Sequence, residues 1–222
     1  MPYKDFVLKL HTKTKRDYLK RVTDHDKSEC ASVAKEYGKD YWDGDRKYGY
    51  GGYYYDGRWE VVAREMIDHY GLKPGDRILD IGCGKGFLLY EFKKLIPGLF
   101  IRGVDISEYG LAHAKEEVRG ELLSAPAQKL PFEDNEFDFV FSLGTFHNLR
   151  IFDLEKAISE MNRVGKYSEK MYIMLESYRN EKERVNLLYW QLTCESFYSV
   201  EEWEWLYNRF RYQGDYSFIF FE

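Results

Sequence analysis

Residues 77–86 read Arg-Ile-Leu-Asp-Ile-Gly-Cys-Gly-Lys-Gly, and this stretch decides the fold class. It opens with a short apolar run that has the length and composition of a buried strand. It ends with three glycines at alternate positions, which let the backbone turn sharply and approach a ligand without a Cβ in the way. The stretch therefore predicts a strand, a ligand-binding turn and the start of a helix.

Strand-like and helix-like segments alternate after this turn. Strands are predicted at residues 77–81, 99–105, 121–124, 137–143, 171–175 and 216–221, and helices at 87–96, 108–119 and 153–164, with Asp153 as a plausible N-cap. A helix at 59–70 precedes the first strand, and residues 180–209 are predicted to be helical with a break near 196–199. Alternation at this pitch predicts an α/β, doubly wound, mostly parallel sheet with helices on both faces.

The glycine pattern alone fits several cofactor classes, and spacing removes two of them. A dinucleotide fingerprint and a phosphate-binding P-loop both need a glycine that this chain lacks, because Phe87 or Leu89 stands at the deciding position. Asp105 follows 25 residues after Asp80 and ends the predicted second strand. A carboxylate there can accept hydrogen bonds from both ribose hydroxyls, so the residues predict a pocket for a nucleoside.

Two segments together, 78–86 and Gly103-Val104-Asp105-Ile106-Ser107, closely resemble the first two motifs of class I S-adenosylmethionine (SAM)-dependent methyltransferases. Residues 130–140 are similar to the segment that leads into the fourth strand of that family, in the version common among small-metabolite enzymes. The resemblance covers about residues 59–176. It implies a Rossmann-like sheet of the seven-stranded type, SAM as cofactor, S-adenosylhomocysteine as product, and methyl transfer to a nucleophile.

The resemblance also implies a set of cofactor-binding residues. Asp80 would orient the glycine loop or face the amino group of the methionine moiety. Pro126 is a departure, because such proteins often place an acidic residue there to receive the adenine amino group. The adenine would then depend on the backbone or side chain of Gln128, or on the backbone of Ala127. The predicted cofactor contacts are Asp80, Gly82, Cys83, Gly84, Gly86, Asp105, Ile106, Ala127, Gln128, Ser142, Tyr48 and Tyr53.

Catalytic side chains are expected where the fourth and fifth strands end. His147 titrates near neutral pH and is the candidate general base; the alternative is a structural histidine. Glu176 is the second candidate, to orient a substrate or to pair with Arg179. Thr145 and Tyr178 lie beside these residues and are predicted to contact the acceptor. Residues 142–152 contain no Asp or Glu, so no metal is expected.

Six of the 20 tyrosines fall within residues 41–55, mixed with glycines. This pattern predicts an ordered loop that closes over the ligands, or an aromatic plug at the end of the sheet. In the first case Tyr54 and Arg58 would contact the acceptor, with Arg58 addressing a carboxylate or phosphate. Residues 1–57 are accordingly predicted to form an N-terminal helical cap and aromatic lid. Residues 58–222 would form the SAM-binding domain, with C-terminal helices and a terminal strand in 177–222.

The acceptor is predicted to be a small, polar, anionic metabolite, methylated on a hydroxyl or, as second choice, an amine. A weaker resemblance to methyltransferases of bacterial surface-carbohydrate pathways suggests a carbohydrate or phosphate-bearing intermediate. A net charge of −5 argues against a nucleic-acid partner. The adenine- and cytosine-methylating Asn/Asp-Pro-Pro-aromatic clamp is also absent from the sequence. An RNA methyltransferase and a non-catalytic SAM-binding regulatory protein remain the alternatives.

The composition predicts a cytoplasmic protein with no membrane partner. Hydrophobic residues make up 44% of the chain, mean hydropathy is −0.59, and no apolar run approaches the roughly 18 residues of a membrane-spanning helix. The three cysteines, Cys30, Cys83 and Cys194, are odd in number and widely spaced, which favours neither disulfides nor a zinc site. Residues 1–22 are rich in Lys and Arg, which suits an anionic small molecule or a solvated helix. The choice between monomer and homodimer stays open.

Overall fold

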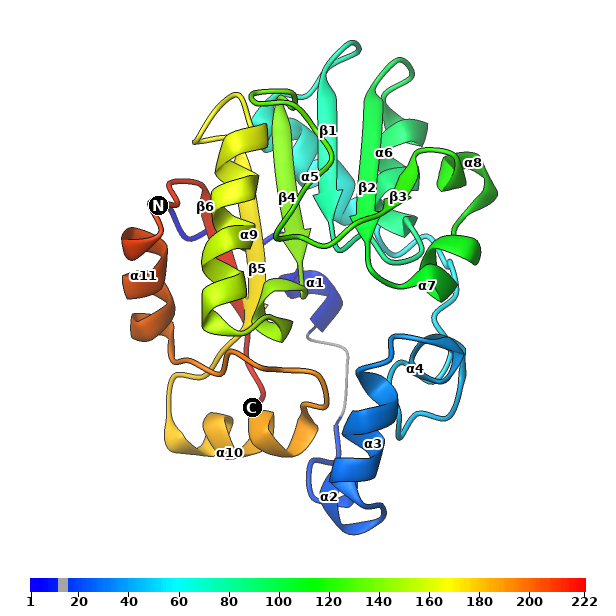
Figure 1. Ribbon diagram of the computed structural model, residues 1–222, viewed down its shortest axis with the longest axis vertical. Helices are drawn as coiled ribbons and strands as arrows, with labels where there is room; N and C mark the ends of the chain where they lie inside the picture. Colours follow the sequence, from blue (N-terminus) through cyan, green and yellow to red (C-terminus); the bar gives the residue numbers. More distant parts are fainter. Residues whose placement is uncertain (12–15) are drawn as a thin grey trace.

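The computed structural model describes residues 1–11 and 16–222, so Lys13 and Lys15 of the basic N-terminal stretch lie outside the described residues (Figure 1). One sheet has the strand order β3-β2-β1-β4-β5-β6, and every neighbouring pair is parallel. The strands are β1 (Arg77–Ile81), β2 (Phe100–Asp105), β3 (Leu122–Ser124), β4 (Phe139–Leu143), β5 (Met171–Glu176) and β6 (Asp215–Ile219). The predicted α/β, Rossmann-like, doubly wound class is confirmed.

Helices cover both faces of the sheet, as Figure 1 shows. Alternation along β1 sends Ile78 to a core shared with α5 (Glu60–Tyr70) and α6 (Phe87–Leu95). Its neighbour Leu79 enters a second core, shared with α9 (Ile151–Val164) and α11 (Val200–Arg209). Because successive side chains of a strand point to opposite faces, each strand serves both cores and the sheet is buried on both sides.

The N-terminal helices gather beyond the carboxyl ends of the strands, where α10 (Glu181–Trp190) also lies (Figure 1). They are α1 (Leu8–His11), α2 (Lys20–Thr23), α3 (Lys27–Ala34) and α4 (Lys39–Asp43). Only α4 overlaps the aromatic loop at 41–58. Phe6 and Val7, just before α1, are fully buried in the core of the α5 and α6 face. The start of the chain is therefore tied to the same core as the sheet.

The predicted helix at 108–119 is two short helices, α7 (Glu108–Ala112) and α8 (Glu116–Arg119). The N–H of Lys115 donates to the carbonyl oxygen of Lys85 in the glycine loop, at 3.1 Å, instead of continuing the helical ladder. Lys115 accordingly has a non-helical backbone at φ −52° and ψ 129°. The N-cap of α9 also differs from the prediction, because Arg150 takes that position and Asp153 lies inside the first turn.

The sheet has six strands in the described residues, one fewer than the seven-stranded type. Residues 191–198 form no strand, and β6 pairs parallel to β5 without an antiparallel hairpin partner. The outer edge of β6 is met by the N-terminus, where the Lys4 N–H donates to the carbonyl oxygen of Tyr216 at 2.9 Å. This contact and a bridge at Tyr3 cover part of an edge that would otherwise expose unpaired backbone groups.

Three other features concern compartment and metals. Among residues 1–11 and 16–222, no helix has both the length and the apolar character to cross a membrane. In the same residues no three His, Cys, Asp or Glu side chains gather as a metal site would require. Cys30, Cys83 and Cys194 are unpaired thiols. Location and metal independence stay predictions.

Candidate active site

The glycine loop lies between the end of β1 and the start of α6. Gly82 has φ +86°, and a Cβ built there would lie 2.0 Å from Oγ1 of Thr145. A Cβ on Gly84, at φ +53°, would lie 2.6 Å from the ring of Trp42. These two glycines are thus required by both backbone conformation and space. Gly86 also has a positive φ, but it faces Val118 and Leu122 and supports the start of α6.

Asp105 ends β2 and binds the glycine loop directly. Its Oδ2 accepts the N–H of Gly84 at 2.7 Å, and its Oδ1 accepts the N–H of Ser107 at 2.8 Å. Each carboxylate oxygen keeps a further lone pair for a ligand hydroxyl. Burial raises the pKa of Asp105, although the amide hydrogen bonds oppose that shift. Asp105, the residue predicted to bind the ribose hydroxyls, is therefore held in position by the glycine loop.

Asp80 is a buried carboxyl group that faces the cavity with only 6% of its surface exposed. Burial, and then the charge of Asp105, raise its pKa well above the ordinary value. Within the described residues no amide or side chain donates a hydrogen bond to its carboxylate. A cationic ligand group would restore its ionised form, as the amino group of a methionine moiety would do.

Two adjoining cavities open beside the loop. One, of about 300 Å³, is lined by Asp105, Ile106, Thr145 and the 125–128 segment that contains Ala127 and Gln128. The other, of about 440 Å³, is lined by Asp80, Cys83, His147 and Glu176. Both are bounded by the same residues, which are Tyr41, Trp42, Tyr50, Gly82, Leu143, Gly144 and Asn148. Together they have the size of a site for a nucleoside cofactor and a small second ligand.

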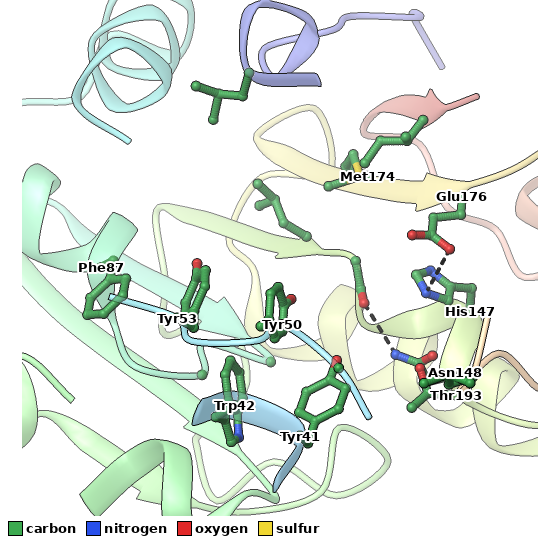
Figure 2. Close-up of a pocket in the computed structure, with 18 of the residues that line it drawn as sticks. Tyr41, Trp42, Tyr50, Tyr53, Phe87, His147, Asn148, Met174, Glu176 and Thr193 are labelled. Atoms are coloured by element: carbon green, nitrogen blue, oxygen red, sulfur yellow. Dashed lines mark hydrogen bonds and ion pairs between the residues drawn. The ribbon is translucent and has the colours of Figure 1, made fainter. Parts of the chain in front are cut away.

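Aromatic rings from the 41–58 segment form a row along one side of the larger cavity, opposite His147 and Glu176 (Figure 2). The Trp42 and Tyr50 rings stack with centroids 5.3 Å apart and planes 7° apart. Tyr53 continues the row at 4.6 Å from Tyr50 and 4.9 Å from Phe87. The segment thus packs on the end of the sheet and also lines the cavity, so the lid and plug interpretations describe one arrangement.

Lys85 of the glycine loop fastens this segment to the sheet. It is 3% exposed, and its Nζ donates to both carboxylate oxygens of Asp43 at 2.7 Å and to the carbonyl oxygen of Tyr53 at 2.9 Å. Burial alone would raise the pKa of Asp43, but hydrogen bonds from Lys85, the Tyr53 N–H and Tyr109 hold that pKa below its usual value. The loop that predicts the cofactor site therefore also anchors the cap.

The polar end of the larger cavity contains His147, Asn148 and Glu176. Nε2 of His147 lies 3.8 Å from Oε2 of Glu176 (Figure 2). Burial lowers the pKa of His147 to about 4 and raises that of Glu176 to about 8, although Arg16 opposes the second shift. Nδ1 of His147, Oδ1 of Asn148 and Oε2 of Glu176 are buried without a hydrogen-bond partner among the described residues. Three such atoms on one wall indicate a ligand that satisfies them.

The geometry separates the other predicted residues into two groups. Tyr53, Tyr54 and Arg58 line the larger cavity, with Arg58 paired to Asp56 through Nε at 2.7 Å. Three others lie off both cavities. Ser142 donates to the carbonyl oxygen of Ile81 at 2.7 Å, Tyr48 packs on the small cluster of Cys30, Ala34 and Leu192, and Tyr178 packs on Phe197 with centroids 5.2 Å apart.

One predicted ion pair does not form, and several cavity residues were not predicted. Arg179 pairs with Glu183 and Glu222, so the suggested pair between Arg179 and Glu176 does not form. Several residues that line the larger cavity were not predicted from the sequence. These are Arg16, Arg21, Trp42, Arg46, Tyr50, Asn148 and Trp190. The basic N-terminal stretch was the only signal for the first two arginines.

Comparison with known proteins agrees with this geometry. The family model described as "Methyltransferase domain" matches residues 79–173. The chain is 28% identical to YrhH of Bacillus subtilis, named as a methyltransferase, over 130 residues (56% of this chain and 71% of YrhH). It is 31% identical to demethylmenaquinone methyltransferase of Staphylococcus aureus over 160 residues (66% of this chain and 65% of that protein). Residues 79–173 therefore form a methyltransferase domain, and these relatives support its being of the class I SAM-dependent kind.

A solved structure extends the agreement to the fold of this methyltransferase. YcgJ of Bacillus subtilis superposes with a TM-score of 0.56 at 23% identity, covering 67% of this chain and 66% of YcgJ. At that identity the likeness concerns the fold alone. The chain spans about two thirds of the length of the curated relatives it matches.

Proposed function

We propose that this methyltransferase transfers a methyl group from SAM to a hydroxyl, or second to an amine, of a small anionic metabolite. The observation that carries the proposal is the set of partnerless buried atoms on His147, Asn148 and Glu176. They lie on the wall of a cavity that continues to the glycine loop. An acceptor with hydroxyl groups would satisfy them.

The residues around the loop fit SAM. Asp80 would hold the amino group of the methionine moiety, Asp105 the ribose hydroxyls, and Ile106, which is 56% exposed, would contact the adenine ring. Ala127 and Gln128 line the same cavity, in keeping with an adenine contact that does not need an acidic residue at Pro126. When bound, SAM supplies a methyl group on a positively charged sulphur, which reacts by in-line displacement.

The protein must align the acceptor, exclude water and accept the acceptor's proton. Nδ1 of His147 is the atom we assign to the proton, because it is buried, partnerless and neutral over the physiological range. Glu176 lies beside the opposite ring nitrogen, Nε2, so its carboxylate would stabilise the imidazolium that forms. The backbone carbonyl of His147 accepts the N–H groups of Glu195 and Ser196, at 3.0 and 2.9 Å, which holds the backbone that carries the ring.

Positive charge along the larger cavity indicates the class of acceptor. The Staphylococcus aureus relative is named for demethylmenaquinone. Arg16, Arg21, Arg46 and Arg58 line the larger cavity here, and such a lining suits an anionic acceptor better than a neutral one. A carbohydrate or phosphate-bearing intermediate fits that description. We further propose a cytoplasmic enzyme, in keeping with three unpaired thiols.

A transfer assay tests the proposal. The purified protein is incubated with methyl-labelled SAM and panels of sugar phosphates, hydroxy acids, amines and total RNA. We expect label on an anionic small molecule, and a loss of at least 100-fold in kcat for His147→Ala with unchanged S-adenosylhomocysteine affinity. Label on RNA alone would favour a nucleic-acid enzyme. Tight S-adenosylhomocysteine binding with no transfer would favour a regulatory protein.

A further inference from the structure

Three arginines from separate segments meet at one tryptophan on the wall of the larger cavity. The guanidinium carbons of Arg16, Arg21 and Arg46 lie 5.4, 5.1 and 5.1 Å from the centroid of the Trp190 ring. Arg21 belongs to α2, Trp190 ends α10, and the other two lie in connecting segments. All four residues line the cavity. We refer to the three arginines as the arginine cluster.

No carboxylate forms an ion pair with the arginine cluster in the part of the chain that the structure describes. Arg21 donates instead to backbone carbonyl oxygens of Arg46 at 2.7 Å and of Trp190 at 3.3 Å. Nε of Arg16 is buried and has no hydrogen-bond partner among the described residues. Residues 12–15 read Thr-Lys-Thr-Lys, so they contribute no acidic side chain to the cluster.

The arginines also repel one another. Burial, and then the charge of Arg46, lower the pKa of Arg21. Burial is likewise the largest influence that lowers the pKa of Arg46, and Arg16 adds to it. Like charges held together without a counter-charge destabilise a site, unless an anion binds there. The cluster therefore has the character of a preformed anion site.

The arginine cluster shares its cavity with the proposed proton acceptor. The positive charge of Arg16 lowers the pKa of Glu176, although burial raises that pKa by more. An anionic group at the cluster would therefore anchor one end of an acceptor whose other end reaches His147. Arg58, the anion-binding residue expected from the sequence, is already paired with Asp56. The arginine cluster, which has no carboxylate partner among the described residues, is therefore better suited than Arg58 to bind an anion.

We propose that the arginine cluster binds a phosphate group of the methyl acceptor. This inference rests on the proposed function and narrows its acceptor to phosphorylated compounds. A phosphate monoester carries about −1.5 to −2 charge near neutral pH and offers three acceptor oxygens. Three guanidinium groups, each a rigid fork of donors, match that charge and geometry better than they match a single carboxylate.

Calorimetric titration of inorganic phosphate into the S-adenosylhomocysteine-saturated protein tests the proposal. Ionic strength is held constant with chloride, and acetate is titrated in parallel to represent a carboxylate. The variants are Arg16→Gln and Arg46→Gln, and the control is Arg64→Gln, because Arg64 is an exposed arginine of α5 that pairs with Glu60. We expect phosphate to bind the wild type at least tenfold more tightly than acetate does. Each cluster variant should weaken phosphate binding tenfold or more, and Arg64→Gln should leave it unchanged.

Three results would overturn the proposal. These are no phosphate binding to the wild type, equal or tighter binding of acetate, and unchanged phosphate affinity in both cluster variants. The affinity for S-adenosylhomocysteine is measured first in every protein, so that failure of the cluster's proposed role is distinguished from failure of the proposed function. If the wild type binds S-adenosylhomocysteine but not phosphate, the cluster's role is wrong while the methyltransferase assignment stands. If it does not bind S-adenosylhomocysteine, the proposed function itself fails.

Discussion

His147 and Glu176 are individually ordinary residues whose chemistry comes from where they are buried. In water an imidazole and a carboxyl group would have pKa values near 6.5 and 4.5, and burial moves them in opposite directions, to about 4 and about 8. At neutral pH the pair therefore carries one proton that it releases near pH 8. The sequence identified both residues from their places after strands, but no sequence pattern reports burial, so it could not predict the reversed pKa order.

The pH dependence of activity tests the roles of this pair. Glu176 can stabilise an imidazolium only when its carboxyl group is ionised. We therefore expect kcat/KM of the wild type to rise with pH to a plateau above about pH 8. Glu176→Gln should lower kcat and remove that ascending limb. A rise near pH 8 that persists in Glu176→Gln would assign the titration to another group.

The same pKa shift predicts a pH dependence of stability. Between pH 6.5 and 8 the unfolded chain has already lost the Glu176 proton while the folded protein still binds it. The free energy of unfolding should therefore fall as pH rises through this window, by about 2 kcal/mol. His147 contributes only below pH 6.5, with the opposite sign. Denaturant titrations of the wild type and Glu176→Gln across this range measure the difference, and parallel curves would contradict it.

Gly82→Ala tests the close approach at the loop. An added Cβ would meet the Thr145 side chain and would hold a non-glycine residue at φ +86°, a conformation that costs about 1–2 kcal/mol before any clash. We expect lower stability and at least tenfold weaker S-adenosylhomocysteine binding. Gly120→Ala is the control, because its φ is −68° and a Cβ there would meet nothing within 4 Å. Equal effects of the two substitutions would show that Gly82 has no special role.

The strands and long helices were predictable because each follows a simple periodic rule. The predicted β1 matches the observed Arg77–Ile81, and α5 and α6 lie where apolar spacing placed them. The differences from the prediction arise where residues that are far apart in the sequence come into contact. The break between α7 and α8 depends on a hydrogen bond from Lys115 to the glycine loop, and residues 191–198 form no strand that could pair with β6.

The contact of α4 with the glycine loop is an example of such a long-range interaction. The Lys85–Asp43 pair is largely buried, at 4% and 13% side-chain exposure. Asp43→Ala would leave a buried lysine without its counter-charge, so we expect the free energy of unfolding to fall by about 3 kcal/mol. Asp56→Ala breaks the exposed pair with Arg58 in the same segment and should cost at most about 1 kcal/mol. Urea denaturation compares the two, and similar losses would show that the Lys85 contact does not hold the cap.

At the scale of the whole molecule, Phe6 and Val7 of the N-terminal segment are buried in the core of the sheet. Residues 1–57 were predicted as a cap and lid because tyrosines and glycines are concentrated in residues 41–55. That pattern could not show that Phe6 lies within the main core, where its ring meets Tyr172 edge-on at 5.0 Å. The predicted division at residue 57 thus does not separate two hydrophobic cores. A functional division between cap and SAM-binding domain stays a prediction.

Phe6→Ala measures that integration. The side chain is 2% exposed, so its removal should lower the free energy of unfolding by about 3–5 kcal/mol. Leu8→Ala removes a nearby apolar side chain that is 58% exposed and should change stability by no more than about 0.5 kcal/mol. Thermal or urea unfolding provides both values. A small loss for Phe6→Ala would mean that the N-terminal segment is peripheral.

The acceptor site is assembled from distant parts of the chain, which explains why the sequence predicted the donor better than the acceptor. The donor loop and Asp105 lie close together in sequence and follow a recurrent motif. The arginine cluster brings together residues 16, 21 and 46 with Trp190, at the other end of the chain. Such a grouping exists only in the folded molecule.

The central claim is that the Asp80–Gly86 loop and Asp105 form a SAM site, and calorimetric titration with S-adenosylhomocysteine tests it most directly. Asp105→Asn is compared with Asp138→Asn, a carboxylate that also accepts a backbone N–H but lies at the opposite, amino-terminal end of the strands. We predict binding to the wild type and to Asp138→Asn, and at least tenfold weaker binding to Asp105→Asn, since hydrogen bonds to a charged group contribute about 1.5–3 kcal/mol. No binding to the wild type, or equal affinities for all three proteins, would contradict the account.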